Sequence, residues 1–241
     1  MKFAIGIWLT LAAFSQAAGL EFTELLKDVE APADAAMVTT DFNFTNKSDK
    51  PVTIAKAEPA CPCLKAQVSG GKLKYAPNES GVIRITFEVG NLAGTVEKVL
   101  PIYIDDDIKP SIQLTVRVHI PVLIAVSVFE HPSDLKTAKW NLGAKPEPQT
   151  IQIRMAEGKT IHVTGVKSSS PAFKCELKAL EEGKKYDLIV TPLATNAPEM
   201  SVLRIETDCE ISKHRIQQAF AVVRKLSPGE VALAPKEKAG P

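Results

Sequence analysis

The sequence predicts an all-β protein built from two tandem immunoglobulin-like β-sandwiches. Short segments alternate apolar and polar residues, turn residues separate them about every ten positions, and the plan of the first half recurs in the second. The chain has 241 residues, enough for two domains of about a hundred each. Because 45% of its residues are hydrophobic, each half can bury a core.

Residues 1–18 have the pattern of a secretory signal peptide. Lys2 is their only charge, residues 3–14 form an apolar run, and residues 15–18 offer small side chains for cleavage. A buried N-terminal helix is the alternative interpretation. The run is too short to cross a bilayer, and the rest of the sequence contains no longer one. We therefore expect a secreted or periplasmic protein with no transmembrane segment.

The charge balance argues against nucleic acid as a partner. Removal of the signal takes away one of the 29 basic residues and none of the 28 acidic ones. The mature chain therefore carries no net charge, whereas a phosphate-binding surface needs a basic face.

The first sandwich is expected over residues 19–120. In its predicted strands every second residue is apolar, as a half-buried strand requires. These strands are expected near residues 38–44, 51–57, 82–89, 96–104 and 112–118.

The second sandwich is expected over residues 121–225 as a divergent copy of the first. Residues 46–57 align with 155–166, and residues 102–107 align with 203–208. The two offsets differ, which we attribute to a length change in the intervening loops. From residue 226 the pattern ends in Pro, Gly and scattered charges, so residues 226–241 are expected to be a disordered tail.

Four cysteines remain after signal removal, in a compartment that permits disulfides. Three full pairings exist. A bridge between Cys175 and Cys209 is the simplest within one domain, and we expect it, closing a loop of about 35 residues.

The Cys61-Pro62-Cys63 segment has reactive potential. Two residues spaced by one point the same way in an extended chain, so both sulfurs could hold a soft metal such as Cu(I) or Zn. The interpretation we favour is a small disulfide between Cys61 and Cys63 in a loop between strands. No neighbouring ligand set supports the metal, because the four histidines are scattered: His119, His131, His162 and His214.

No catalytic or cofactor-binding residues are expected. The run Asp105–Asp107 has the oxygen ligands that Ca²⁺ prefers, but no spaced ligand pattern follows it, so a solvated turn is favoured. The serines of residues 168–170 lack a nucleophile elbow. We therefore expect that the protein is not an enzyme.

The first half resembles a family of secreted bacterial immunoglobulin-like domains of unknown function. The family is related in fold to the Hydin-type and major-sperm-protein-like sandwiches, and its pattern includes Cys-Gly-Cys-Thr and Pro-Gly-Glu elements. Cys61 and Cys63 match the two cysteines, but Pro62 replaces the Gly, Leu64 the Thr, and Asn78 the Gly of the turn. The other matching residues are Phe44, Asn46, Ser48, Asp49, Pro51, Ile54, Pro77, Glu79, Gly94, Asp107, Pro110 and Leu114.

This resemblance covers about residues 20–118 and implies an exported, non-enzymatic sandwich without naming a substrate. We therefore expect a binding or structural module of the periplasm or cell envelope, whose partner is a protein or another envelope component. Two other hypotheses remain open: a soft-metal or thiol carrier that uses Cys61 and Cys63, and a chaperone-like protein that binds client strands at a sheet edge.

Overall fold

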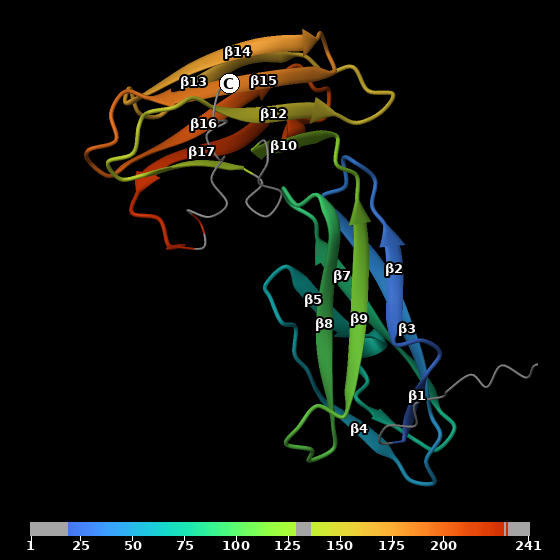
Figure 1. Cartoon of the computed structure of the whole chain (residues 1–241). Helices are drawn as coiled ribbons and strands as arrows, with labels where there is room; N and C mark the ends of the chain where they lie inside the picture. The colour runs from blue at the N-terminus through green and yellow to red at the C-terminus, as the bar shows by residue number, and fades with distance from the viewer. Residues whose placement is uncertain (1–18, 129–135, 229, 231–241) are drawn as a thin grey trace, which may run out of the picture. The chain divides into compact units, whose positions relative to one another are not determined.

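The computed structural model describes residues 19–128, 136–228 and 230, whose regular secondary structure is almost entirely β-strand (Figure 1). The chain divides into two compact units, Met1–Pro121 and Val122–Pro241, and the expected domain break after residue 120 lies one residue earlier. The expected signal peptide lies outside the described residues. Within the described part of the chain, no helix is long and apolar enough to cross a membrane.

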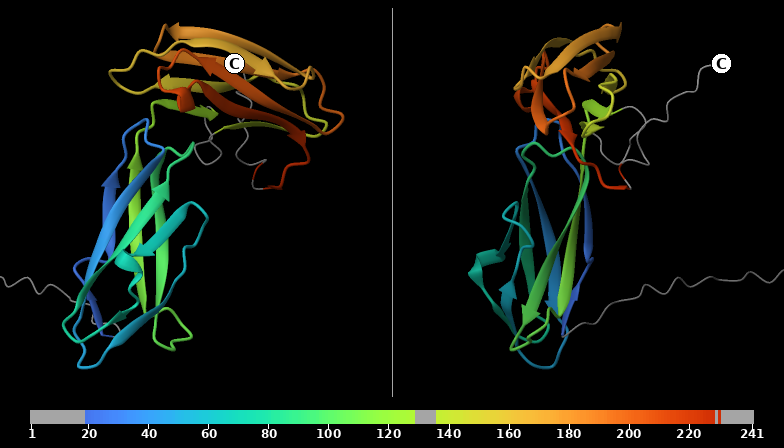
Figure 2. Two further views of the ribbon diagram at one scale, coloured as in Figure 1. Left: turned by 180° about the vertical axis from the view of Figure 1, so that it is seen from behind. Right: turned by 60° about the vertical axis from the view of Figure 1, so that its left-hand side comes forward.

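Unit 1 consists of two β-sheets, visible as two layers in Figure 2. One sheet has the strand order β1-β3-β7-β5, and the other has the order β2-β9-β8-β4-β6. The first two strands of the chain belong to different sheets, since β1 pairs antiparallel with β3 and β2 pairs parallel with β9. The strands are β1 (Leu20–Phe22), β2 (Leu26–Glu30), β3 (Met37–Asn46), β4 (Val52–Ala57), β5 (Leu64–Val68), β6 (Lys74–Tyr75), β7 (Ser80–Glu88), β8 (Gly94–Ile104) and β9 (Ile112–Ile120).

Unit 2 repeats this topology without a counterpart of β6. Its sheets have the orders β10-β12-β15-β14 and β11-β17-β16-β13. As β2 pairs parallel with β9 in unit 1, β11 pairs parallel with β17, the last strand of unit 2 in the sequence. These are the A-B-E-D and A′-G-F-C orders of immunoglobulin-like sandwiches, so the predicted fold class is confirmed. The strands are β10 (Ile124–Val128), β11 (Thr137–Asn141), β12 (Gln149–Met155), β13 (Val163–Ser168), β14 (Phe173–Glu181), β15 (Lys185–Pro192), β16 (Glu199–Thr207) and β17 (Ile216–Arg224).

The structure corrects one of the two predicted alignments between the halves. Ile54 pairs with Ile104 in unit 1, and Val163 pairs with Thr207 in unit 2. The alignment of 46–57 with 155–166 therefore holds. The alignment of 102–107 with 203–208 is wrong by two residues, because Ile104 corresponds to Thr207. A slip of two keeps every apolar side chain on the same face, so alternation could not reveal it.

A hydrogen bond between an aspartate and the neighbouring strand, which we call the aspartate clamp, occurs in both units and supports the corrected alignment. The Asp105 carboxylate accepts a hydrogen bond from the Thr53 backbone N–H at 2.8 Å. The Asp208 carboxylate accepts the equivalent bond from His162 at 2.7 Å, and its second oxygen lies 2.7 Å from His162 Nδ1. These two contacts hold the pKa of the Asp208 carboxyl below its ordinary value. Each aspartate therefore ties the end of one strand to the start of its neighbour.

The core of unit 1 is held together at one end by aromatic rings and a buried amide. The Phe44 ring meets Tyr75 edge-on, with centroids 4.8 Å apart. Beside them Asn46 is fully buried, and its Nδ2 donates to the carbonyls of Lys50 and Tyr75 at 2.8 and 2.9 Å. Its Oδ1 accepts from the backbone and the hydroxyl of Ser48. The Asn46 amide is therefore satisfied while it fixes the turn into β4.

The expectation that residues 226–241 are disordered is wrong for the first residues of this segment. Leu226 donates its backbone N–H to Asn141 Oδ1 at 3.0 Å, and the Glu230 carboxylate binds side chains of β11 and β17. Composition alone could not show that these few residues find partners on a neighbouring sheet.

Replacement of Gly81 by alanine should destabilise unit 1 by about 2 kcal/mol, because an added Cβ overpacks a filled core. The new atom would lie 2.4 Å from Phe44 Cζ and 2.6 Å from Tyr75 Cε1. Gly165→Ala is the matched control in unit 2, where the nearest atom, Glu206 Oε2, is 3.5 Å away. Urea unfolding followed by circular dichroism should show the loss for Gly81→Ala alone. A transition shifted equally by both variants would contradict this packing.

Candidate functional site: the open edge of strand β8

The segment between β4 and β5 is closed by a disulfide between Cys61 and Cys63, whose Cα atoms are 5.2 Å apart. The Cys63 carbonyl accepts a hydrogen bond from Glu88 at 2.8 Å, which fixes the loop to the end of β7. Both cysteines are partly buried against the core of unit 1. A loop this short removes little entropy from the unfolded chain, about 1.6 kcal/mol in the loop-closure model. The disulfide therefore serves mainly to shape the loop.

The disulfide that we favoured is present, so the alternative metal site at Cys61 and Cys63 is not available in this oxidised state, because the two sulfurs are bonded to each other and are not thiolates. In the part of the chain that the structure describes, no three His, Cys, Asp or Glu side chains come together as metal ligands.

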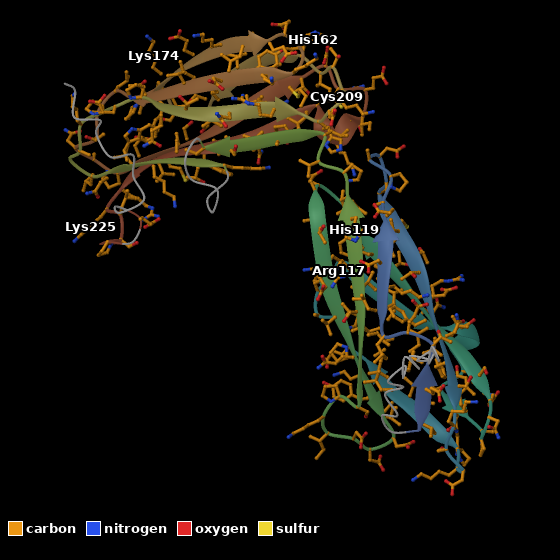
Figure 3. All side chains as sticks on the ribbon, turned by 45° about the vertical axis from the view of Figure 1, so that its right-hand side comes forward. Arg117, His119, His162, Lys174, Cys209 and Lys225 are labelled. Atoms are coloured by element: carbon orange, nitrogen blue, oxygen red, sulfur yellow. A yellow bond between two sulfur atoms is a disulfide. The ribbon has the colours of Figure 1, made fainter. Side chains whose placement is uncertain are left out.

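The expected disulfide between Cys175 and Cys209 is wrong, since both residues are free cysteines. Cys175 lies in β14, six residues before Glu181, which is about 20 Å of extended chain. Cys209 follows β16 at the other end of unit 2, next to the Asp208 clamp. Figure 3 labels Lys174, the neighbour of Cys175, far from Cys209 within unit 2. Cysteines so far apart cannot be bridged.

Strand β8 extends well beyond the strand that should cover it. It has 11 residues, but β4 pairs only with Ile102–Ile104. One more contact follows, from the Glu58 N–H to the Pro101 carbonyl, before the chain turns away towards the disulfide loop. Figure 1 shows β4 beside only one end of β8. Among the described residues, no strand pairs with this side of β8 between residues 95 and 100.

The backbone groups left open can be assigned from the ladder. In an antiparallel strand the N–H and C=O of one residue point to the same side, and the side alternates along the chain. The Pro101 carbonyl points towards β4, whereas the Ile102 carbonyl accepts from Ser111 on the β9 side. The N–H and C=O of Thr95, Glu97 and Val99 therefore point to the open side. Pro101 lies at a position with the same orientation, where no N–H is required.

The duplicated unit shows what normally covers this edge. In unit 2, β13 pairs with β16 as far as Leu203, and Ser169 then exchanges hydrogen bonds with Val202. Val202 corresponds to Val99 of unit 1. The Ser201 hydroxyl accepts from the Ser170 N–H, so the cover continues for another residue. The serines that follow β13 therefore extend the cover of this edge to the position that Val99 occupies in unit 1, which has no such cover.

Charged side chains lie on the outer face beside the open edge. Arg117 binds Glu97 at 3.0 Å and Asp28 at 3.5 Å, and the Glu97 contact is the main reason that the pKa of Arg117 is raised. His119 Nε2 lies 3.0 Å from Asp28, and its Nδ1 lies 3.1 Å from the Thr95 hydroxyl. Figure 3 shows Arg117 and His119 on β9. The network joins β2, β9 and β8 across the sheet.

The hydroxyl–imidazole–carboxylate order of Thr95, His119 and Asp28 superficially resembles a catalytic triad. Catalysis would also need donors aimed at a developing oxyanion and a site that excludes water. These side chains are instead part of the exposed outer face of a sheet, and they do not line the two hollows beside Arg84 in the described part of the chain. The arrangement holds strands together, and its chemistry at the edge is hydrogen bonding by the backbone.

Residues 20–120 match the model of a family described as "Protein of unknown function (DUF1573)". The match falls within unit 1 and has nearly the extent of the resemblance found from the residues. No curated protein matches the chain.

Several solved structures are distantly similar. A protein of unknown function from Porphyromonas gingivalis W83 is 8% identical, with 86% of this chain and 100% of that chain covered and a TM-score of 0.36. The CupB2 chaperone of Pseudomonas aeruginosa is 11% identical, with 84% and 98% covered and a TM-score of 0.30. A putative carbohydrate binding protein from Bacteroides ovatus ATCC 8483 is 11% identical, with 78% and 64% covered and a TM-score of 0.35. Similarities this low carry no argument about function.

Alkylation should distinguish the cysteines. Denatured, unreduced protein should take up two equivalents of N-ethylmaleimide, at Cys175 and Cys209, and reduction should expose Cys61 and Cys63. In the native protein Cys175 should react slowly until the pH is well above the usual thiol range, because burial raises its pKa and the thiolate is the reactive form. Peptide mass mapping measures which cysteines are modified and how fast Cys175 reacts. Absence of uptake before reduction would contradict the free thiols.

Proposed function

We propose that this protein is an exported, non-enzymatic binding module that adds an extended segment of a partner protein to the open edge of β8. The observation that carries the proposal is the row of open backbone donors and acceptors at Thr95, Glu97 and Val99, whereas in unit 2 the position of Val99 is covered through Val202. An added strand gains main-chain hydrogen bonds at such an edge and specificity from alternate side chains. Export is proposed from the signal-like N-terminus, and the partner is then a protein of the periplasm or cell surface.

A second copy of this chain would meet like charges in the two registers centred on the charged residues of the β8 edge. Two β8 edges pairing about Glu97 would place two carboxylates opposite each other, and pairing about Lys98 would place two ammonium groups opposite each other. Like charges directly opposite are destabilising. A partner strand with a basic residue opposite Glu97 avoids this repulsion, so the side chains of the edge favour a partner of different sequence.

A designed peptide tests the proposal: acetyl-Thr-Val-Lys-Val-Thr-Val-Thr-amide, whose lysine can lie opposite Glu97. We expect saturable binding that slows hydrogen exchange at the amides of Thr95, Glu97 and Val99. Val99→Pro should weaken binding about fivefold, because it removes one outward donor worth about 1 kcal/mol and leaves the β9 ladder intact. Val99→Ala is the matched control, since it removes the side chain but keeps the N–H.

Two results would contradict strand addition at this edge. One is equal affinity of Val99→Pro and Val99→Ala for the peptide, and the other is protection confined to amides outside β8. A version of the peptide with proline at its centre should not bind, because it cannot complete the ladder.

A further inference from the structure

An apolar patch lies on the outer face of the β11-β17-β16-β13 sheet of unit 2. Met200 pairs across the sheet with Val222, and Val202 pairs with Phe220. Their neighbours Ser201 and Ala221 are fully buried between the sheets, so these four side chains point outwards. Met200 is 61% exposed. We call these four residues the unit 2 patch.

The same position in unit 1 is charged. In the alignment fixed by Ile104 and Thr207, Met200 and Val222 correspond to Glu97 and Arg117. An ion pair in one copy is therefore an apolar pair in the other. In an antiparallel sheet the side chains on the exposed face are normally polar. A group of apolar side chains on that face therefore indicates a surface that binds another molecule.

Two cations border the unit 2 patch. Lys139 lies opposite Val222 on β11, and Arg224 lies at the end of β17. Both bind the carboxylate of Glu230, at 2.9 and 2.6 Å. Together with contacts from Ser227 they hold the pKa of the Glu230 carboxyl far below its ordinary value. The cation pair therefore accepts a carboxylate carried by a chain that is not part of the sheet.

The charges at this position are reversed between the units. Asp28 of unit 1 corresponds to Lys139 of unit 2, because they pair with Arg117 and Val222, respectively. Unit 1 places an acid at this position of the sheet, whereas unit 2 places a base there, to which Glu230 binds from outside the sheet. Unit 2 as a whole also has more basic than acidic residues, 17 against 14.

From this geometry we infer that the unit 2 patch is a docking site for a segment of another protein that carries a carboxylate followed by apolar residues. The carboxylate binds Lys139 and Arg224, and the apolar residues cover Met200 and Val222. Glu230 shows the chemistry that the cation pair accepts, and it competes with the partner for the same two cations. This site is separate from the β8 edge, and neither depends on the other.

The probe is a fluorescent peptide with the sequence of residues 226–234, which supplies a glutamate followed by Val-Ala-Leu-Ala. With the full mature chain, Glu230→Gln should bind it about tenfold more tightly than wild type, because the internal competitor is weakened. A tenfold change corresponds to about 1.4 kcal/mol. The same peptide with glutamine in place of glutamate should bind neither protein. Fluorescence anisotropy measures each affinity.

Met200→Lys in the Glu230→Gln background should abolish binding, because it places a charge in the apolar contact. The matched control is Met37→Lys in unit 1, a methionine of nearly equal exposure at 59%, which should leave the affinity unchanged. The inference is overturned if the glutamate peptide fails to bind Glu230→Gln, or if Met200→Lys binds as well as Met37→Lys. If the Glu230→Gln variant dimerises in a concentration-dependent manner without any peptide, the unit 2 patch binds a second copy of this chain, and the inference of a different partner protein is overturned.

Discussion

The point at which β4 leaves β8 determines which backbone groups of unit 1 stay open. A central strand needs hydrogen-bond partners on both of its sides. Where a neighbouring strand ends early, the backbone groups beyond its end bind water or another chain. In unit 1 the last contact is the Glu58 N–H on the Pro101 carbonyl, and the chain then enters the loop fixed by the Cys61–Cys63 disulfide. In unit 2 the equivalent strand continues through Ser169. One topology therefore gives two edges that are covered to different extents.

The duplication also separates what the fold requires from what each copy has changed. Both units retain the aspartate clamp at the end of β8 and β16, through Asp105 and Asp208, because it closes a strand end that every copy must close. The outer faces have diverged: Glu97 and Arg117 form an ion pair where Met200 and Val222 form an apolar contact. Positions that differ between copies of one scaffold are those that packing leaves free, and such positions can acquire a binding role.

Alternation in the sequence was sufficient to predict most strands and the core, since residues such as Phe42, Ile85 and Leu114 are buried as their spacing requires. The alternation did not give the correct pairing where two segments far apart in the sequence come into contact. The Cys175–Cys209 pairing looked simple in sequence, but strand direction places the two residues at opposite ends of unit 2. The two-residue error in the internal alignment has the same origin, because a period of two does not specify register.

The open edge itself was within reach of the sequence only in part. Pro59 and Pro62 show that the chain after β4 cannot continue as a paired central strand, because proline lacks the donor that the ladder needs. What they could not show is that β8 extends several residues further, which depends on its pairing with β9. Pro101 then limits the open edge, since it removes a donor next to the last covered residue. In the proposed strand addition, a partner strand registers against Thr95, Glu97 and Val99, and the carboxylate of Glu97 lies in the middle of that register. In this proposal the backbone groups supply the affinity for an extended chain, and the charge of Glu97 selects among the chains.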